Sequence, residues 1–324
     1  MQIIPSQKYN FSLSVIIPVF DDEEVLPELY KRLRASLEKL TSDWEIIFVD
    51  DGSSDGSLRV LTDLQAGDDS IKVIQLTRNF GQPNAIAAGL EHAQGDVIVL
   101  MDSDLQDRPE DIEKLLEAML ENNVPMAVAC WSSRKDNPLK VAASSLFNAL
   151  ANRITSVHYI PRSRVFRVIK REILEELKAF PEKTATSLSL LYWMGHNYAV
   201  VDLDRDPRYA GSSGYTLTRM LKLSLDRIFS YSLMPIRLAS VLGVCLGIIS
   251  VLLAVYFTIQ KLFFMRVVPG WTSIVVIMLF LLGMNFIFIG IIGEYLGRIY
   301  IETKNRPKYV IKQVYQKKED RVGG

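Results

Sequence analysis

The 324 residues are enough for a complete α/β domain and one further segment. The formal net charge is zero, but residues 1–124 carry a net −14 (24 Asp and Glu, 10 Lys and Arg) and residues 125–324 a net +14 (13 against 27). An acidic half suits metal binding, whereas a basic half suits phosphate groups or an anionic membrane surface.

Cys130 and Cys245 lie in apolar runs, which argues against a disulfide framework, and the N-terminus lacks the pattern of a signal peptide. We therefore expect the first 200 residues to stay in the cytoplasm.

Residues 13–130 alternate short apolar runs with helical patterns and short connections. The predicted strands are Leu13–Val19, Glu45–Asp50, Ile71–Leu76, Val97–Met101 and Met126–Cys130, and the predicted helices are 22–40, 56–66, 81–94 and 109–122. Near-continuous apolar strands are typical of a parallel sheet buried on both faces. This part of the chain therefore predicts a doubly wound, mainly parallel α/β sheet.

The strand pattern stops at residue 138. We expect helices over 138–154, 170–179 and 184–195, and one further strand at Tyr198–Leu203. Residues 217–234 place leucines among basic residues at helical spacing, just before a long apolar segment. Such a basic amphipathic helix lies in a membrane interface or packs on the soluble core, and both alternatives stay open.

Two apolar segments, about 238–260 and 272–297, are each long enough for the roughly 20 residues that cross a bilayer core. The short connection holds only Lys261 and Arg266, whereas the chain from Arg298 onward holds eight Lys and Arg residues. The positive-inside rule then places both ends of this hairpin in the cytoplasm. Within the second segment, Glu294 is either a functional group or the partner of Arg298 in an ion pair.

These patterns divide the chain into four predicted parts. They are an α/β domain over 1–214, an amphipathic helix over 215–236, a two-helix transmembrane hairpin over 237–298 and a basic tail over 299–324. The tail contains one possible short strand, Lys308–Tyr315. Two spans bury few helix contacts, so we also expect self-association in the membrane.

The triplet Asp102-Ser103-Asp104 directly follows the apolar strand Val97–Met101. Residues two apart on a strand point to the same side, so both carboxylates leave the strand together, where open α/β sheets bind ligands. Hard divalent cations prefer oxygen ligands, and a metal that bridges these carboxylates to a diphosphate explains the pair. The alternative is an aspartate-rich loop that caps the next helix.

A second acidic turn, Asp50-Asp51-Gly52-Ser53-Ser54-Asp55, ends the strand Glu45–Asp50. Gly52 permits a tight turn, and Ser54 or Asp55 can cap the following helix. Capping does not explain two successive aspartates at the carboxyl end of a strand. Carboxylates there can accept hydrogen bonds from a nucleobase or a ribose.

Together these motifs resemble glycosyltransferase family 2. The residues that carry the resemblance are Val15-Ile16-Ile17-Pro18-Val19-Phe20, Asp50-Asp51-Gly52-Ser53 and Gly95-Asp96 through Asp102-Ser103-Asp104-Leu105-Gln106-Asp107. With the two-span hairpin, residues 13–300 look like a polyisoprenyl-phosphate glycosyltransferase of the bactoprenol glucosyltransferase or dolichol-phosphate mannose synthase type. The resemblance implies a GT-A fold, with a Rossmann-like sheet that binds a nucleotide sugar through Mg²⁺ or Mn²⁺.

The resemblance also implies roles for particular residues. Pro18, Asp22, Asp50 and Asp51 would line the nucleoside pocket, and Asp102, Asp104 and Gln106 match a metal-binding Asp-x-Asp-x-Gln pattern. Asp102, Asp104 and Arg164 would serve catalysis, Arg134, Lys140 and Ser144 would hold the acceptor phosphate, and Arg208 and Ser213 belong to a loop that closes on the donor diphosphate. The chain departs from the family pattern at three places: Phe20, Asp21 and Asp22 replace Tyr, Asn and the first Glu, Val141 stands where the family often has arginine, and Gly214 stands where it has lysine.

The implied reaction is an inverting transfer of a hexose, glucose from UDP-glucose, to undecaprenyl phosphate at the cytoplasmic face of the cell membrane. GDP-mannose and modified pentose donors are the alternatives within the family. A lipid phosphate is largely ionised without a protein base, and none of the three histidines lies in a base motif.

A processive polysaccharide synthase is disfavoured because Gln-x-x-Arg-Trp is absent, and a lipid-carrier binding or transport protein is the rival of another class. No nucleic-acid partner is expected.

Overall fold

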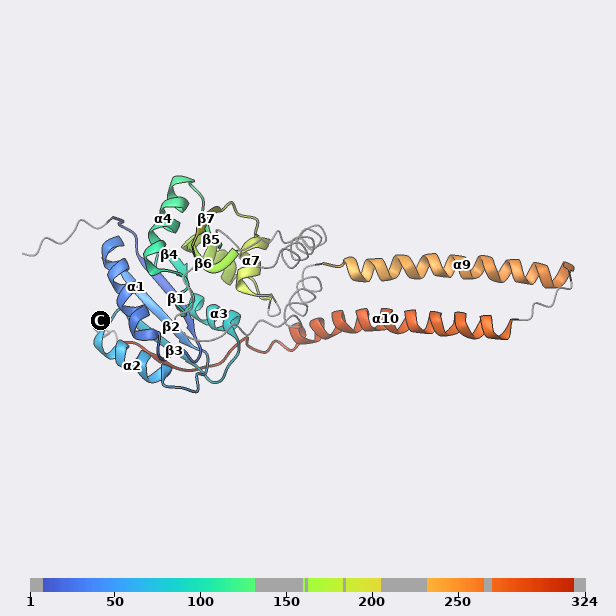
Figure 1. The fold of residues 1–324 in the computed structure, drawn as a ribbon, viewed down its shortest axis with the longest axis horizontal. Coiled ribbons are helices and arrows are strands. Elements are labelled where there is room, and N and C mark those ends of the chain that lie inside the picture. The colour runs from blue at the N-terminus through green and yellow to red at the C-terminus, as the bar shows by residue number, and fades with distance from the viewer. Residues whose placement is uncertain are drawn as a thin grey trace, which may run out of the picture. The chain divides into compact units, whose positions relative to one another are not determined.

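The computed structural model describes residues 8–131, 160, 163–182, 185–204, 232–264 and 270–317 (Figure 1). The chain forms two compact units. The first comprises residues 1–152, 157–215 and 306–324, and the second comprises residues 153–156 and 216–305. The helix predicted over 138–154 lies outside the described residues, as does nearly all of the amphipathic helix predicted over 215–236.

The first unit is built on one eight-stranded sheet, in the order β7-β5-β6-β4-β1-β2-β3-β8. The strands are β1 (Leu13–Val19), β2 (Trp44–Asp50), β3 (Ile71–Leu76), β4 (Val97–Leu100), β5 (Met126–Trp131), β6 (Ser163–Lys170), β7 (Ala199–Leu203) and β8 (Ile311–Tyr315). The pairs β1–β2, β1–β4, β2–β3 and β5–β7 are parallel, whereas β6 and β8 run antiparallel to their neighbours. The predicted mainly parallel sheet is confirmed.

Helices cover both faces of this sheet. They are α1 (Leu26–Leu40), α2 (Ser57–Gly67), α3 (Gln82–His92), α4 (Ile112–Glu121), α6 (Arg171–Lys178) and α7 (Ser187–Trp193). Buried side chains of α1, α2 and α4 join the strand residues of one face in a single apolar cluster. On the opposite face, α3 packs so closely on β1 and β2 that a Cβ at Gly89 would meet Ile16 and Val49.

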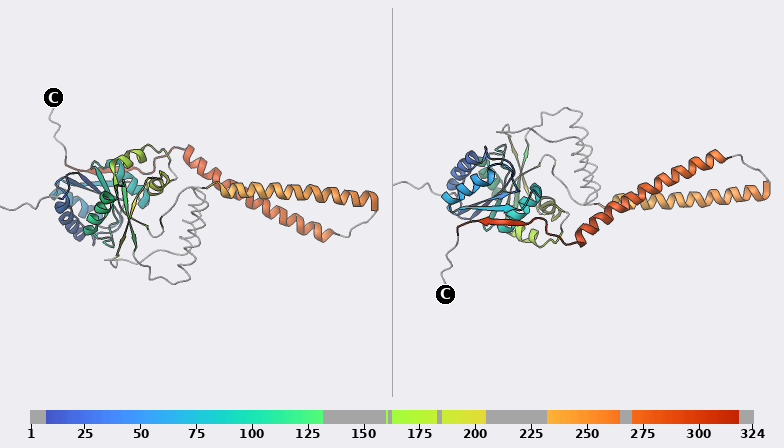
Figure 2. Two further views of the ribbon diagram at one scale, coloured as in Figure 1. Left: turned by 90° about the horizontal axis from the view of Figure 1, so that it is seen from above. Right: turned by 90° about the horizontal axis from the view of Figure 1, so that it is seen from below.

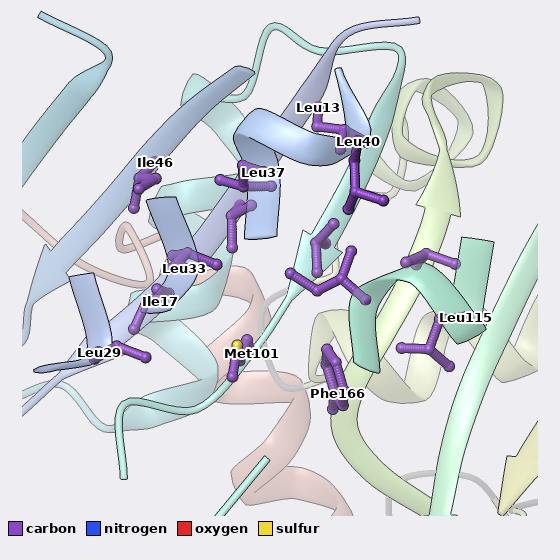
Figure 3. Packing of buried hydrophobic residues seen from close by; sticks show 14 of the residues in the cluster. Leu13, Ile17, Leu29, Leu33, Leu37, Leu40, Ile46, Met101, Leu115 and Phe166 are labelled. Carbon is purple, nitrogen blue, oxygen red and sulfur yellow. The ribbon is translucent and has the colours of Figure 1, made fainter. Parts of the chain in front are cut away.

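The apolar side of α1 follows from the spacing of its leucines. Leu29, Leu33, Leu37 and Leu40 recur every three or four residues, and each is at most 4% exposed. They pack against strand residues that include Ile17 and Ile46 (Figure 3). Full burial of one such side chain contributes about 1.5–3 kcal/mol. This packing fixes the strands whose carboxyl ends carry the acidic motifs.

Strand β6 was not predicted from the sequence. Arg164 and Arg167 interrupt its apolar pattern, and arginine is rarely buried. Here Arg164 is 8% exposed and Arg167 is 0% exposed, because β6 lies between β4 and β5 in the sheet interior. The omission matters because the start of β6 lies beside the carboxyl end of β4.

The chain returns to the sheet at its C-terminal end. Strand β8 pairs antiparallel with β3, and Figure 2 shows it, in red, along the sheet. This confirms the strand expected within Lys308–Tyr315, although the strand itself is shorter. The tail therefore belongs to the same compact unit as the sheet.

The second unit contains two long helices, α9 (Met234–Phe264) and α10 (Trp271–Thr303), which form a hairpin (Figure 1). Met234–Leu253 and Phe280–Thr303 are long and apolar enough to cross a membrane, with mean hydropathies of 2.4 and 1.7. Both helices extend beyond the predicted segments. Glu294 accepts from Arg298 at 2.8 Å, which favours the ion-pair interpretation of this residue.

The close approach of α3 to the sheet makes a prediction about Gly89. A Cβ at this position would lie 2.3 Å from Ile16 Cγ2, so Gly89→Ala should destabilise the protein by about 1–3 kcal/mol through overpacking. Gly67→Ala is the matched control, because a Cβ there meets nothing within 4 Å. Thermal unfolding of both variants checks this, and equal melting temperatures would contradict the packing described here.

Candidate active site

The predicted acidic motifs converge because their strands are neighbours. Strands β4, β1 and β2 are adjacent and parallel, so their carboxyl ends meet at one edge of the sheet. Pro18 lies at the end of β1, Asp50 at the end of β2, and Asp102 just beyond β4. Ligands of open α/β sheets bind at this edge.

Asp50 and Asp51 have different surroundings although they are consecutive. Asp50 is 1% exposed, and its Oδ1 accepts one hydrogen bond from the amide of Ser53 at 3.2 Å. Asp51 accepts at both oxygens, from the amides of Phe80 at 2.7 Å and Gly81 at 2.8 Å. Burial raises the pKa of both carboxyl groups, and the hydrogen bonds partly oppose this. Asp51 thus holds the connection between β3 and α3.

Gly52 explains why this turn needs glycine. Its φ is +72°, and a Cβ there would lie 2.5 Å from the carbonyl carbon of Arg78. Any side chain would therefore push the residues after β3 away from the acidic turn. The turn and the β3–α3 connection pack backbone against backbone.

Asp22 connects the end of β1 to the triplet after β4. Its Oδ2 accepts a hydrogen bond from Ser103 Oγ at 2.5 Å. Burial raises the pKa of the Asp22 carboxyl, with a further increase from the nearby charges of Asp104 and Asp55. Its neighbour Asp21 is used structurally, because it accepts from the amide of Ser54 at 2.7 Å.

The two aspartates of the triplet are held by separate contacts. Asp102 Oδ1 accepts from Gln82 Nε2 at 2.6 Å, and Asp104 Oδ1 accepts from the amide of Gln106 at 3.2 Å. Leu105, which lies between Asp104 and Gln106, is buried with a φ of +55°, a conformation that costs a non-glycine residue of order 1–3 kcal/mol. The helix-capping alternative is wrong, because the following helical turn begins at Pro109 and its N-cap is Arg108.

Gln106 has a buried amide without a complete set of hydrogen bonds. Its Oε1 has no hydrogen-bond partner, and the residue is 7% exposed. A buried acceptor of this kind is costly unless a ligand satisfies it. Across the described part of the chain, no three or more His, Cys, Asp or Glu side chains gather as a metal site. A cation at the triplet would therefore take its remaining ligands from elsewhere.

Arg164 lies beside the triplet but is occupied by structural contacts. It forms a buried ion pair with Asp107, and its Nη2 donates to the carbonyl of Leu203 at 2.9 Å. Its guanidinium carbon lies 5.8 Å from the centre of the Trp131 ring. This arginine ties β6 and β7 to the segment after the triplet, and its predicted catalytic role stays a prediction.

Two residues near the site were missed from the sequence. Gln82 belongs to no recognisable sequence motif, and only the fold brings it to Asp102. Arg167 could have been noticed in the sequence, because an arginine inside an apolar run indicates a buried charge. It donates to the carbonyls of Arg164 and Val165, toward the start of β6, and its Nη1 has no hydrogen-bond partner.

The other predicted site residues lie outside the described residues. They are Arg134, Lys140 and Ser144 for the acceptor phosphate, and Arg208 and Ser213 for the donor diphosphate. Of the histidines, His92 contacts the carbonyl of Ala88 and His196 contacts Glu176. Both contacts lie within the first unit.

Comparison with known proteins extends this description. Residues 14–178 match the family described as Glycosyl transferase family 2. The chain is 37% identical over 305 residues to the SfII prophage-derived bactoprenol glucosyl transferase of Shigella flexneri, covering 94% of this chain and 98% of the relative. It is 34% identical over 309 residues to the uncharacterized glycosyltransferase YkcC of Bacillus subtilis, covering 94% and 95%.

A solved structure supports the fold. The mannosyltransferase PcManGT from Pyrobaculum calidifontis, in complex with GDP-Man and Mn²⁺, superposes with a TM-score of 0.50 at 19% identity, covering 70% of this chain and 65% of that one. This likeness concerns the sheet and its helices. The likeness shows that the fold is GT-A-like. The family match over half of the chain shows that the protein is a glycosyltransferase and belongs to glycosyltransferase family 2.

Proposed function

We propose that this protein transfers glucose from UDP-glucose to a polyprenyl phosphate, undecaprenyl phosphate, with inversion at the anomeric carbon. The observation that carries the proposal is the acidic edge of β4, β1 and β2 in a chain that aligns over 94% of its length with a bactoprenol glucosyl transferase. A lipid-carrier protein without catalysis would not need this arrangement of carboxylates.

In this proposal the nucleoside binds at the ends of β1 and β2. Asp50 is the main candidate for a base or ribose contact, because its carboxylate accepts a backbone hydrogen bond at Oδ1 from its own turn, whereas both oxygens of Asp51 accept amides of the β3–α3 connection. Asp51 supports the pocket through the Phe80 and Gly81 amides, and Asp22 supports it through Ser103. Pro18 forms part of the wall.

Asp102, Asp104 and Gln106 are proposed to hold a divalent cation. Mg²⁺ is usually bound through one or two carboxylates, substrate phosphates and water, which suits a site with two aspartates and one buried amide oxygen. When bound, such a cation neutralises the charge that develops on a departing diphosphate. Mn²⁺ uses the same oxygen ligands.

The acceptor supplies its own nucleophile. A phosphate monoester has a second pKa of about 6, so it is largely ionised at neutral pH. Its oxygen forms a bond to the anomeric carbon while the bond from that carbon to the donor's β-phosphate oxygen breaks, and UDP leaves with the electron pair. The protein positions the two anionic groups, for which we propose Arg134, Lys140 and Ser144 at the acceptor and Arg208 and Ser213 at the donor.

The hairpin of α9 and α10 is proposed to span the cell membrane, with the catalytic domain and both termini in the cytoplasm. The composition of both helices suits a bilayer. The basic amphipathic segment 215–236 would lie at the interface, where the acceptor phosphate emerges. The proposal includes self-association of the protein in the membrane.

The reaction is tested with purified full-length protein, undecaprenyl phosphate and radiolabelled UDP-glucose, scoring label in the organic phase. We expect transfer that requires Mg²⁺ or Mn²⁺, stops with EDTA and falls at least about 100-fold in Asp104→Asn. Asp63→Asn, an exposed site on α2, is the matched control and should keep full activity. Transfer from GDP-mannose alone, or lipid binding without transfer from any donor, would contradict the proposal.

The buried charge of Asp50 predicts a cost in stability. Because its pKa is raised in the folded state, the protein loses stability as pH rises from about 4 through the raised pKa. Asp50→Asn should therefore raise the melting temperature at pH 7, lose this advantage near pH 4, and weaken UDP binding.

Asp96→Asn is the control, for which we expect the opposite change in stability. Hydrogen bonds from Ser12 lower the pKa of Asp96, so its replacement should destabilise at pH 7 and matter less in acid. A lower melting temperature for Asp50→Asn at pH 7 would contradict the argument.

A further inference from the structure

The chain that leaves the second apolar helix is bonded to the connection between β3 and α3. Helix α10 ends at Thr303, and only residues 304–309 separate it from Val310. The carbonyl of Val310 accepts a hydrogen bond from the amide of Thr77 at 2.9 Å. Strand β8 follows at once and pairs with β3, with Leu76 opposite Ile311. We call residues 306–317 the tail strand segment and residues 77–81 the β3–α3 loop.

The β3–α3 loop is held from two sides. On one side, Asp51 accepts from the amides of Phe80 and Gly81, and Gly52 leaves no room for a Cβ against Arg78. On the other side lies the tail strand segment, through Val310 and the pairing of β8. The loop's backbone position therefore depends on both neighbours.

This loop leads directly into the residue that contacts the triplet. Gln82 is the first residue of α3, and its Nε2 donates to Asp102 Oδ1 at 2.6 Å. A shift of the loop moves Gln82 and with it the orientation of the Asp102 carboxylate. Errors of about 1 Å in the position of a reacting group can lower a rate by about 100-fold.

The tail strand segment has its own anchors on the first unit. Lys308 Nζ donates to the carbonyl of Ala185 at 3.3 Å, before β8, and Lys317 pairs with Asp69 after it. Ile311, Val314 and Tyr315 are partly buried along the strand. These contacts bind the segment to the sheet as an edge strand.

We propose that the tail strand segment is a positioning element of the active site, which fixes the β3–α3 loop so that Gln82 orients Asp102. Gln82 and Val310 are then positioning residues. The segment that follows α10 thereby supports the active site through the backbone of the β3–α3 loop. This inference rests on the proposed function, because turnover is one of its two readouts.

The test uses the full-length protein with Gln313→Pro and Val314→Pro. Alternate residues of a strand direct their amides to opposite sides, so one of the two prolines removes a hydrogen bond to β3. Gln313→Thr with Val314→Thr keeps both amides and is the matched control. We expect the proline variant to lose at least about 10-fold in kcat with donor KM within about 3-fold, and the control to keep wild-type kcat.

Hydrogen exchange supplies the second readout. The amides of Phe80 and Gly81 should exchange at least about 10-fold faster in the proline variant than in the control, because their loop has lost one of its two supports. If the wild-type protein transfers no sugar, the proposed function fails, while this exchange measurement still tests the loop support. Unchanged protection of both amides would overturn the inference.

A double-mutant cycle separates positioning from general stability. Gln82→Ala alone should lower kcat, and adding the two prolines to it should cost little more, since both changes act through the same contact. If the loss of kcat in the combined variant equals the product of the two separate fold-losses, the inference is overturned. If the proline variant does not fold, Ile311→Ala weakens the same strand more mildly and should lower kcat about 2- to 5-fold, and an unchanged kcat in that variant would also overturn it.

Discussion

The structure depends on one electrostatic constraint, the gathering of carboxylates at the common end of three parallel strands. Asp22, Asp50 and Asp51 come to one edge because β4, β1 and β2 are neighbours, and their burial raises their pKa values. Such groups are costly in an empty protein and favourable when a cation or a hydrogen-bonding ligand is present. In the proposed function, this edge favours ligand binding at the expense of stability.

The protein limits this cost with backbone amides. Asp51 takes two amides from the β3–α3 loop, and Asp50 takes one from its own turn. These bonds do more than offset charge, because they fix the turns that carry the other functional groups. The left-handed Leu105, anchored in the apolar core, serves the same end by turning the chain between Asp104 and Gln106. Charge compensation and precise positioning are thus achieved by the same contacts.

Much of this arrangement could be predicted from the sequence. The apolar runs gave β1 and β3 with correct bounds, and strand adjacency then brought Asp50 and Asp102 to one edge. Long-range partners could not be predicted, because Phe80 and Gln82 contact Asp51 and Asp102 only through the fold and carry no motif. Strand β6 was missed because its arginines break the apolar pattern, and their burial depends on local partners such as Asp107.

The central claim is that the acidic edge binds a divalent cation together with a nucleoside diphosphate. The direct measurement is Mn²⁺ binding by electron paramagnetic resonance on the full-length protein, with and without UDP. Two aspartates and one amide oxygen would form an incomplete metal site, so we predict weak Mn²⁺ binding alone and at least about 10-fold tighter binding with UDP. Equal Mn²⁺ affinity with and without UDP, or UDP binding that is unchanged by EDTA, would contradict it.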